Sequence, residues 1–264
     1  MSDVSSKEPR GPESAKTKVF AWGPLAAIVV VFASYLFIPL LAQLQVSLYP
    51  TLLGWDDGAA NDWLQNSTTA SFMYVFLTES ITIAALFWFT SYKHVAFRVA
   101  TALGRPRWRD LAHAFAGFGV YFLLFIAVMM FAQFIPALDV DQEQSLGFDT
   151  GISGANLAMA FASLVILPPL VEEIVFRGFF YGTLRANKVR KWTAVVLTSL
   201  LFGSLHLFGA AEGGLLWIAF IDTFILSVVM CYLRERNGSI WAGIGVHALK
   251  NCFVFVNLFV IGAV

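Results

Sequence analysis

The apolar residues of this chain are arranged in long, almost uninterrupted runs, and these runs restrict its fold more than any other feature. A helix needs about 20 mostly apolar residues to cross the hydrocarbon core of a bilayer, and several runs reach that length. Hydrophobic residues make up 58% of the 264 residues and charged residues 13%, against about 25% charged residues in soluble domains. Composition and arrangement together predict an integral membrane protein.

The sequence predicts an all-α, polytopic bundle of about seven transmembrane helices. The predicted spans are residues 20–45, 71–91, 111–137, 157–184, 192–208, 215–233 and 240–264. The fourth span contains Pro168 and Pro169, so we expect it to tilt or kink. Residues 1–18 are rich in Ser, Lys, Glu and Pro, which predicts a disordered cytoplasmic tail ahead of one transmembrane domain at 19–264.

Lysine and arginine residues are concentrated in every second segment between the predicted spans, although the formal net charge is zero. They precede the first span and follow the second, fourth and sixth, at Lys7, Arg10, Lys16, Lys18, Lys93, Arg98, Arg105, Arg107, Arg109, Arg185, Lys188, Arg190, Lys191, Arg234 and Arg236. The loops around 56–62, 139–149 and 212 contain no Lys or Arg. The positive-inside rule therefore predicts a cytoplasmic N-terminus, an external C-terminus and an odd number of spans. Contact with the lipid bilayer accounts for these cations, so no nucleic-acid partner is expected.

Polar side chains interrupt the apolar spans of the second half, where each is costly in hydrocarbon. They are Glu172, Glu173 and Arg177 in the fourth span, His206 at the end of the fifth, and His247 and Asn251 in the seventh. Glu173 and Arg177 are four residues apart with the acid first, which favours an ion pair within the helix. Glu172 lies about 100° away round the helix and has no such partner. His247 and Asn251 share one helix face and are expected to act on one target.

Distances along the helices suggest that these groups meet. Counting 1.5 Å per residue from the nearest basic loop places Glu172, His206 and Asn251 each about 20–22 Å away from that loop. One interpretation is a buried polar clasp that joins three helices by hydrogen bonds. The other is a general base, its partner and oxyanion donors, which is the set that a hydrolase needs. The combination of acids, histidines and a carboxamide favours catalysis.

The same residues form three motifs, which read Glu172-Glu173-x-x-x-Arg177, Phe202-x-x-x-His206 and His247-x-x-x-Asn251. In this order they resemble the EExxxR, FxxxH and HxxxN motifs of the CAAX-protease and bacteriocin-processing family, which are intramembrane endopeptidases related to the type II CAAX prenyl endopeptidases. The resemblance covers about residues 157–252. It implies that Glu172 and His206 activate a water molecule and that His247 and Asn251 form the oxyanion site. Glu173 and Arg177 would then support these catalytic residues.

The resemblance also implies the kind of substrate, which is a membrane-associated or lipidated peptide or protein, and it implies that no cofactor is needed. We expect a multi-pass protein of the plasma membrane of a prokaryote. A desolvated carboxylate is a competent base near neutral pH, and donors fixed in a low-dielectric cavity stabilise an oxyanion strongly. The physical chemistry of the residues therefore agrees with the implied roles.

Two alternatives use the same polar residues differently. A glutamate and two histidines can hold a catalytic zinc ion and leave its fourth coordination position open for water, as in known zinc hydrolases. The chain lacks the His-Glu-x-x-His motif, however. The cluster could also be structural in a non-catalytic membrane protein of the bacteriocin-immunity or transport type. Glu79 and Asp222 are weaker candidates, which either line a cavity or join helices. Lys250 is expected to compensate an acid such as Glu79.

Overall fold

The computed structural model describes residues 22–135, 138, 147–149, 151–208 and 214–262, and all regular elements in these ranges are helices. In chain order they are α1 (Pro24–Leu52), α2 (Asp57–Asn66), α3 (Thr68–Tyr92), α4 (Phe97–Ala100), α5 (Trp108–Ala132), α6 (Gly154–Phe161), η1 (Ala162–Ile166), α7 (Leu167–Glu173), η2 (Ile174–Phe180), α8 (Tyr181–Ala186), α9 (Lys191–Ser204), α10 (Trp217–Asn237), α11 (Trp241–Phe255) and η3 (Val256–Ile261), where η marks a π-helical segment. The tail predicted at 1–18 lies outside the described residues.

Six helical runs in the described part of the chain are long and apolar enough to cross a membrane. They are Pro24–Leu52, Thr68–Tyr92, Trp108–Ala132, Gly154–Ala186, Trp217–Asn237 and Trp241–Ile261. The predicted all-α, polytopic membrane bundle is confirmed, with a count close to the predicted seven. The remaining predicted span, 192–208, corresponds to α9, whose 14 residues extend about 21 Å. This length is less than the roughly 30 Å of a hydrocarbon core.

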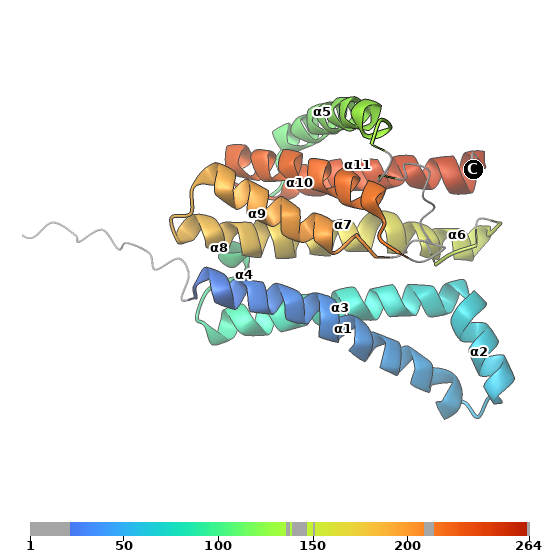
Figure 1. Cartoon of the computed structure of the whole chain (residues 1–264). Helices are drawn as coiled ribbons and strands as arrows, with labels where there is room; N and C mark the ends of the chain where they lie inside the picture. The colour runs from blue at the N-terminus through green and yellow to red at the C-terminus, as the bar shows by residue number, and fades with distance from the viewer. Residues whose placement is uncertain (1–21, 136–137, 139–146, 150, 209–213, 263–264) are drawn as a thin grey trace, which may run out of the picture.

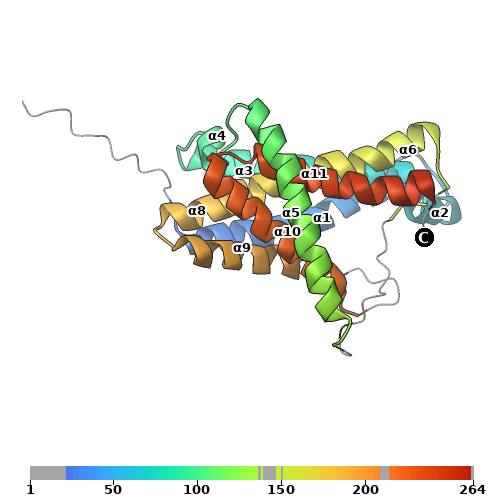
Figure 2. The same ribbon diagram turned by 90° about the horizontal axis from the view of Figure 1, so that it is seen from above.

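The run from α6 to α8 forms the central helix of the bundle. Helices α1 and α3 pack against one side of it, and α9, α10 and α11 pack against the other (Figure 1). Helix α5 crosses over α10 and α11 on the outside of the bundle (Figure 2). In the most apolar 18-residue stretch of the central helix, 50% of the residues are buried, which is the largest share among the six runs. The first polar motif therefore lies where both halves of the chain meet.

The connectors that carry the basic residues lie together at one end of the bundle, near α4 and α8 (Figure 1). Two hydrogen bonds join the connector after α4 to the connector between α10 and α11, from Arg107 Nη2 to Asn237 O and from Trp241 Nε1 to Gly104 O. A third runs from Asn187 to the Trp22 carbonyl at the start of the chain's described part. This grouping is what an alternating topology requires. That the basic end is cytoplasmic stays a prediction.

The central helix departs from α-helical geometry on both sides of its two prolines. Segment η1 ends shortly before Pro168, and η2 begins directly after Glu173. Proline has no backbone N–H and clashes with the preceding turn, so a regular hydrogen-bond ladder cannot pass through Pro168 and Pro169. The distortion expected at the prolines thus takes the form of π-helical segments, which are frequent at functional sites.

Candidate active site

The predicted ion pair between Glu173 and Arg177 is present in the central helix. Arg177 Nη1 donates to Glu173 Oε1 at 2.6 Å, and both side chains are fully buried. The guanidinium group also lies over the ring of Phe202 from α9, with 4.2 Å between the guanidinium carbon and the ring centroid. On the other side, Gly243 of α11 faces Glu173, and a Cβ at this glycine would lie only 2.8 Å from Glu173 Oε2. The buried pair therefore packs between α9 and α11.

His247 of α11 lies between the two adjacent acids. Its Nδ1 atom is 3.4 Å from Glu173 Oε1, and its Nε2 atom is 3.8 Å from Glu172 Oε2. The second distance is too long for a direct hydrogen bond. Glu172 Oε2 is buried and has no hydrogen-bond partner among the described residues. One carboxylate oxygen of Glu172 is thus positioned to bind a water molecule or a substrate proton.

His206 lies just beyond the end of α9 and is oriented by its own turn. Its Nδ1 atom is 2.9 Å from the carbonyl oxygen of Phe202, and donation from Nδ1 leaves Nε2 as the acceptor nitrogen. The Phe202 ring centroid lies 4.7 Å from that of His206 and 6.0 Å from that of His247. Within the described residues no hydrogen bond joins His206 to Glu172. Their joint activation of a water molecule stays a prediction.

Phe202 contacts all three motifs at once. It is fully buried, and its ring touches Arg177 of the first motif, His206 of its own motif and His247 of the third. Sequence analysis placed Phe202 in a motif but gave it no role. The packing shows that this side chain sets the separation between the central helix, α9 and α11.

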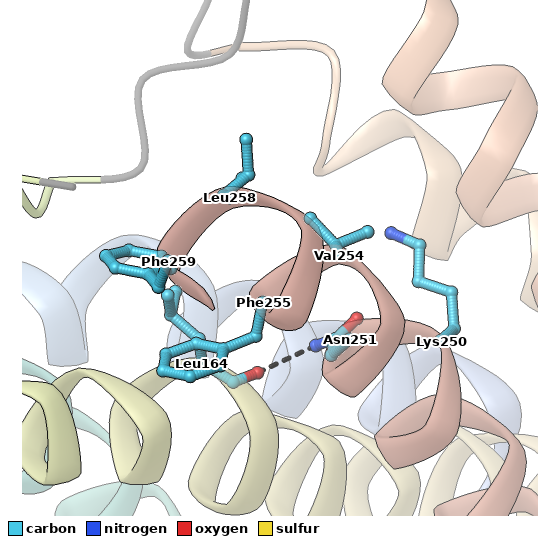
Figure 3. A pocket seen from close by; sticks show the side chains of 7 residues that line it. All are labelled: Leu164, Lys250, Asn251, Val254, Phe255, Leu258 and Phe259. Carbon is cyan, nitrogen blue, oxygen red and sulfur yellow. Dashed lines mark hydrogen bonds between the residues drawn. The ribbon is translucent and has the colours of Figure 1, made fainter. Parts of the chain in front are cut away.

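Asn251 makes a contact that sequence analysis did not predict. Its Nδ2 atom donates to the carbonyl oxygen of Leu164 in η1 at 2.8 Å, as Figure 3 shows. In an α-helix the N–H four residues later would bond to this carbonyl, and in a π-helix the N–H five residues later. These positions are Pro168 and Pro169, which have no backbone N–H, so the carbonyl has neither donor. The N–H of Leu167 is directed to the Ala162 carbonyl instead. The Asn251 amide thus replaces the donor that the prolines remove.

His247 and Asn251 both face the central helix, but they contact it at different levels. His247 lies beside Glu172 and Glu173, whereas Asn251 bonds to Leu164, eight positions earlier in the sequence. Asn251 also lines a cavity of about 70 Å³ together with Leu164 and Lys250 (Figure 3). One N–H of the Asn251 amide is used by the carbonyl, and the amide carries a second. Its action on a substrate oxyanion stays a prediction.

Asn251→Ala is expected to lower both the stability and the turnover of the protein. Removing the amide leaves the Leu164 carbonyl without a partner, which should lower the free energy of unfolding by about 1–3 kcal/mol. If the amide also stabilises an oxyanion, turnover should fall by about 10²–10³. Thermal unfolding and peptide cleavage of the purified variant measure the two losses separately.

Pro168→Ala provides the matched control, because it returns a backbone N–H that can reach the Leu164 carbonyl. Combined with Asn251→Ala, it should recover most of the lost stability while turnover stays low. Recovery of turnover together with stability would show that Asn251 acts only through the Leu164 carbonyl, and the oxyanion role would then be wrong.

Lys250 does not compensate Glu79 as the sequence suggested. Its Nζ atom is 2.8 Å from Asp222 Oδ2 of α10, and the Tyr121 hydroxyl of α5 donates to the other carboxylate oxygen. Helix α11 packs against α5 and α10, whereas Glu79 is carried by α3, which packs against the central helix from its other side. Lys250 does pair with an acid, as expected, but the suggested partner Glu79 was wrong because the neighbours of α11 cannot be read from the sequence alone.

Comparison with known proteins bears directly on the region that carries these motifs. Residues 154–253 match the profile of the family described as type II CAAX prenyl endopeptidase Rce1-like. The motif-bearing part of the chain is therefore similar to Rce1-like proteins. The matched residues include all three motifs, which confirms the resemblance that the motifs indicated. No solved structure matches the chain significantly.

Bacterial relatives extend the similarity beyond the Rce1-like region. The uncharacterized protein YyaK of Bacillus subtilis is 28% identical over 207 residues, which are 75% of this chain and 63% of YyaK. The UPF0177 protein YbdI of Lactococcus lactis is 28% identical over 136 residues, covering 52% of this chain and 69% of YbdI. A third relative, named "Putative membrane peptidase YdiL" of Bacillus subtilis, is 32% identical over 91 residues, 34% of each chain. This chain therefore spans less than two thirds of the length of YyaK and about a third of the length of the relative named as a membrane peptidase.

Two residues outside the Rce1-like region lie close to its first motif. The ring of Tyr35 on α1 packs against Phe176 with 5.3 Å between centroids. Glu79 on α3 is within electrostatic range of both Tyr35 and Glu172. Sequence analysis noted Glu79 as an acid that lines a cavity or joins helices, but it missed Tyr35, because an aromatic residue in an apolar span carries no distinguishing signal. The first half of the chain therefore forms one wall around Glu172.

The arrangement of potential ligands bears on the zinc alternative. Across the described ranges, no group of three or more His, Cys, Asp or Glu side chains has an arrangement that could hold a metal ion. The rings of His206 and His247 both pack against the Phe202 ring. Hydrolysis without a metal stays a prediction.

Proposed function

We propose that this protein is an intramembrane endopeptidase that hydrolyses a peptide bond in a membrane-associated or lipidated peptide or protein through a water molecule activated by Glu172. The similarity to Rce1-like proteins and to a relative named as a membrane peptidase supports the general class. The residues around Glu172 support the more specific chemistry.

The observation that carries the proposal is the state of the Glu172 carboxylate. One of its oxygens is buried without a hydrogen-bond partner among the described residues, although His247 Nε2 lies 3.8 Å away. An unsatisfied buried polar atom is costly, so a residue retained in this state calls for a functional explanation. Glu173 Oε2 and Arg177 Nη2 are unpartnered as well, but the 2.6 Å hydrogen bond between these two side chains holds both of them. Among the described residues, the Glu172 side chain has only the 3.8 Å contact with His247.

In the proposed reaction, water binds between Glu172 and His206 and gives a proton to the Glu172 carboxylate. The resulting hydroxide attacks the carbonyl carbon of the scissile peptide bond. His247 and Asn251 donate hydrogen bonds to the oxyanion of the tetrahedral intermediate, and donors that are fixed in a low-dielectric site act strongly there. The proton held by Glu172 then passes to the leaving amine as the carbon–nitrogen bond breaks.

The purified full-length protein in liposomes provides the test. We expect it to cleave members of a set of internally quenched apolar peptides, and to keep this activity after extensive treatment with a metal chelator. Loss of cleavage after chelation, its return with added zinc, and about one zinc per chain in the active sample would contradict activation by Glu172 alone. Such a result would leave the hydrolase class intact.

A further inference from the structure

A second cavity lies beside the candidate active site, between α5, α10 and α11. Its volume is about 280 Å³. Figure 2 shows the crossing of α5 over the other two helices in this region. Aromatic side chains form much of its wall, namely Phe118, Phe122, Phe125 and Phe253. The cavity is therefore mainly apolar and large enough for several side-chain-sized groups.

Three polar side chains converge on one part of this cavity. Lys250 and Asp222 form the ion pair with 2.8 Å between Nζ and Oδ2, and the Tyr121 hydroxyl donates to Asp222 Oδ1. All three line the cavity and come from three different membrane-spanning helices. Ionisable residues inside transmembrane helices are expensive and typically mark a functional site. The catalytic scheme uses none of these three residues.

Lys250 connects this cavity to the candidate active site. It directly precedes Asn251 and lies about one turn after His247 on α11. Lys250 lines both the larger cavity and the small cavity at Asn251, where Figure 3 shows it beside Asn251. A molecule bound in the larger cavity would therefore lie next to the site of hydrolysis.

We propose that this cavity is a substrate subsite that binds an extended, apolar peptide segment next to the scissile bond. This inference rests on the proposed function and adds the chemistry of substrate binding to it. The phenylalanines pack against apolar side chains of the segment. Lys250 donates to its backbone carbonyls, and Asp222, held by Tyr121, accepts from its backbone N–H groups.

The polar groups of the cavity favour a peptide over a lipid chain. An extended segment leaves its N–H and C=O groups without helical partners, and in a membrane these groups must be satisfied within protein. An ammonium group offers only donors and a carboxylate only acceptors, so the pair matches both kinds of backbone group. A hydrocarbon chain has neither kind. An anionic head group would meet a lysine whose charge Asp222 already neutralises.

Photocrosslinking tests the subsite without requiring turnover. The photoreactive residue benzoylphenylalanine replaces Phe122, which lines the cavity, in the Glu172→Gln protein reconstituted in liposomes. Leu123, which is 70% exposed and does not line the cavity, carries it in the matched control. The probe is a biotinylated synthetic peptide with a central run of Leu, Val and Phe. We expect crosslinking to the probe from position 122, and at least about tenfold less from position 123.

The polar contacts are tested by the double variant Asp222→Leu/Lys250→Met in the same background. Replacing both members of a buried ion pair by apolar residues is often neutral for stability, so the protein should still fold. Removing the backbone partners should lower the crosslinking yield from position 122 by about tenfold or more. A thermal unfolding curve close to that of the parent protein provides the folding control.

Two results would overturn the subsite, namely equal crosslinking from positions 122 and 123, or an undiminished yield in the folded double variant. A probe peptide with Asp and Lys in its central run should crosslink poorly from position 122, and efficient crosslinking of this peptide would contradict the apolar preference. Specific crosslinking by a wild-type protein that cleaves no peptide would contradict the proposed function and still support the subsite.

Discussion

Glu172→Gln is expected to lower peptide cleavage by at least about 10³ while the protein stays fully folded. The substitution keeps the size of the side chain but removes the group that accepts the proton of water. It breaks no hydrogen bond at Oε2, because this atom has no partner among the described residues. It also replaces a largely buried ionisable side chain, 14% exposed, with a neutral one, which removes a cost of desolvation. The unfolding temperature should therefore stay unchanged or rise.

Turnover and thermal unfolding of the same purified sample measure both effects. Catalytic residues are often retained at a cost in stability, so a more stable and inactive variant is the outcome that a catalytic Glu172 predicts. A variant that unfolds at a much lower temperature would instead indicate that Glu172 is part of the structural polar cluster. A folded variant with normal turnover would show that the base lies elsewhere.

Arg177→Met is expected to reduce the stability of the protein strongly, in contrast to Glu172→Gln. Methionine approximates the apolar part of the arginine side chain, but it leaves the fully buried Glu173 carboxylate without its cation. Breaking a buried ion pair from one side typically costs about 3–5 kcal/mol. The free energy of unfolding in a fixed detergent measures this loss.

The double variant Glu173→Leu/Arg177→Met is the matched control. It removes both charges, so no uncompensated carboxylate remains, and most of the lost stability should return. If the single and the double variants are equally unstable, packing against Phe202 rather than charge pairing explains the role of Arg177. Equal destabilisation by Glu172→Gln and Arg177→Met would contradict the different roles assigned to the two acids.

The sequence predicted those features that depend on one helix at a time. Long apolar runs located the six membrane-spanning helices, and the spacing of Glu173 and Arg177 predicted their ion pair. Helix α2 was missed because a search for apolar runs passes over a short polar helix, although Asp56 caps it with its side chain. The π-helical segments could be anticipated only as a distortion at the prolines, since proline shows where a regular helix fails but not how it rearranges.

Contacts between helices were less predictable. The bond from Asn251 to the Leu164 carbonyl and the pairing of Lys250 with Asp222 depend on which helices are neighbours. Adjacent prolines do indicate a carbonyl without a backbone donor, so part of the Asn251 contact had a sequence signal. Tyr35 had none, because its contact with Phe176 joins distant parts of the chain. The catalytic roles themselves stay predictions.

Mass spectrometry of membrane peptides, from cells that express either the intact protein or Glu172→Gln at equal levels, tests the central claim most directly. If Glu172 activates water for intramembrane proteolysis, the cells with the intact protein contain cleaved forms of one or a few membrane-associated proteins, and these forms disappear in the variant while their uncut precursors accumulate. Identical peptides in the two membranes, with both proteins folded and equally abundant, would contradict the assignment of this protein as a Glu172-dependent endopeptidase.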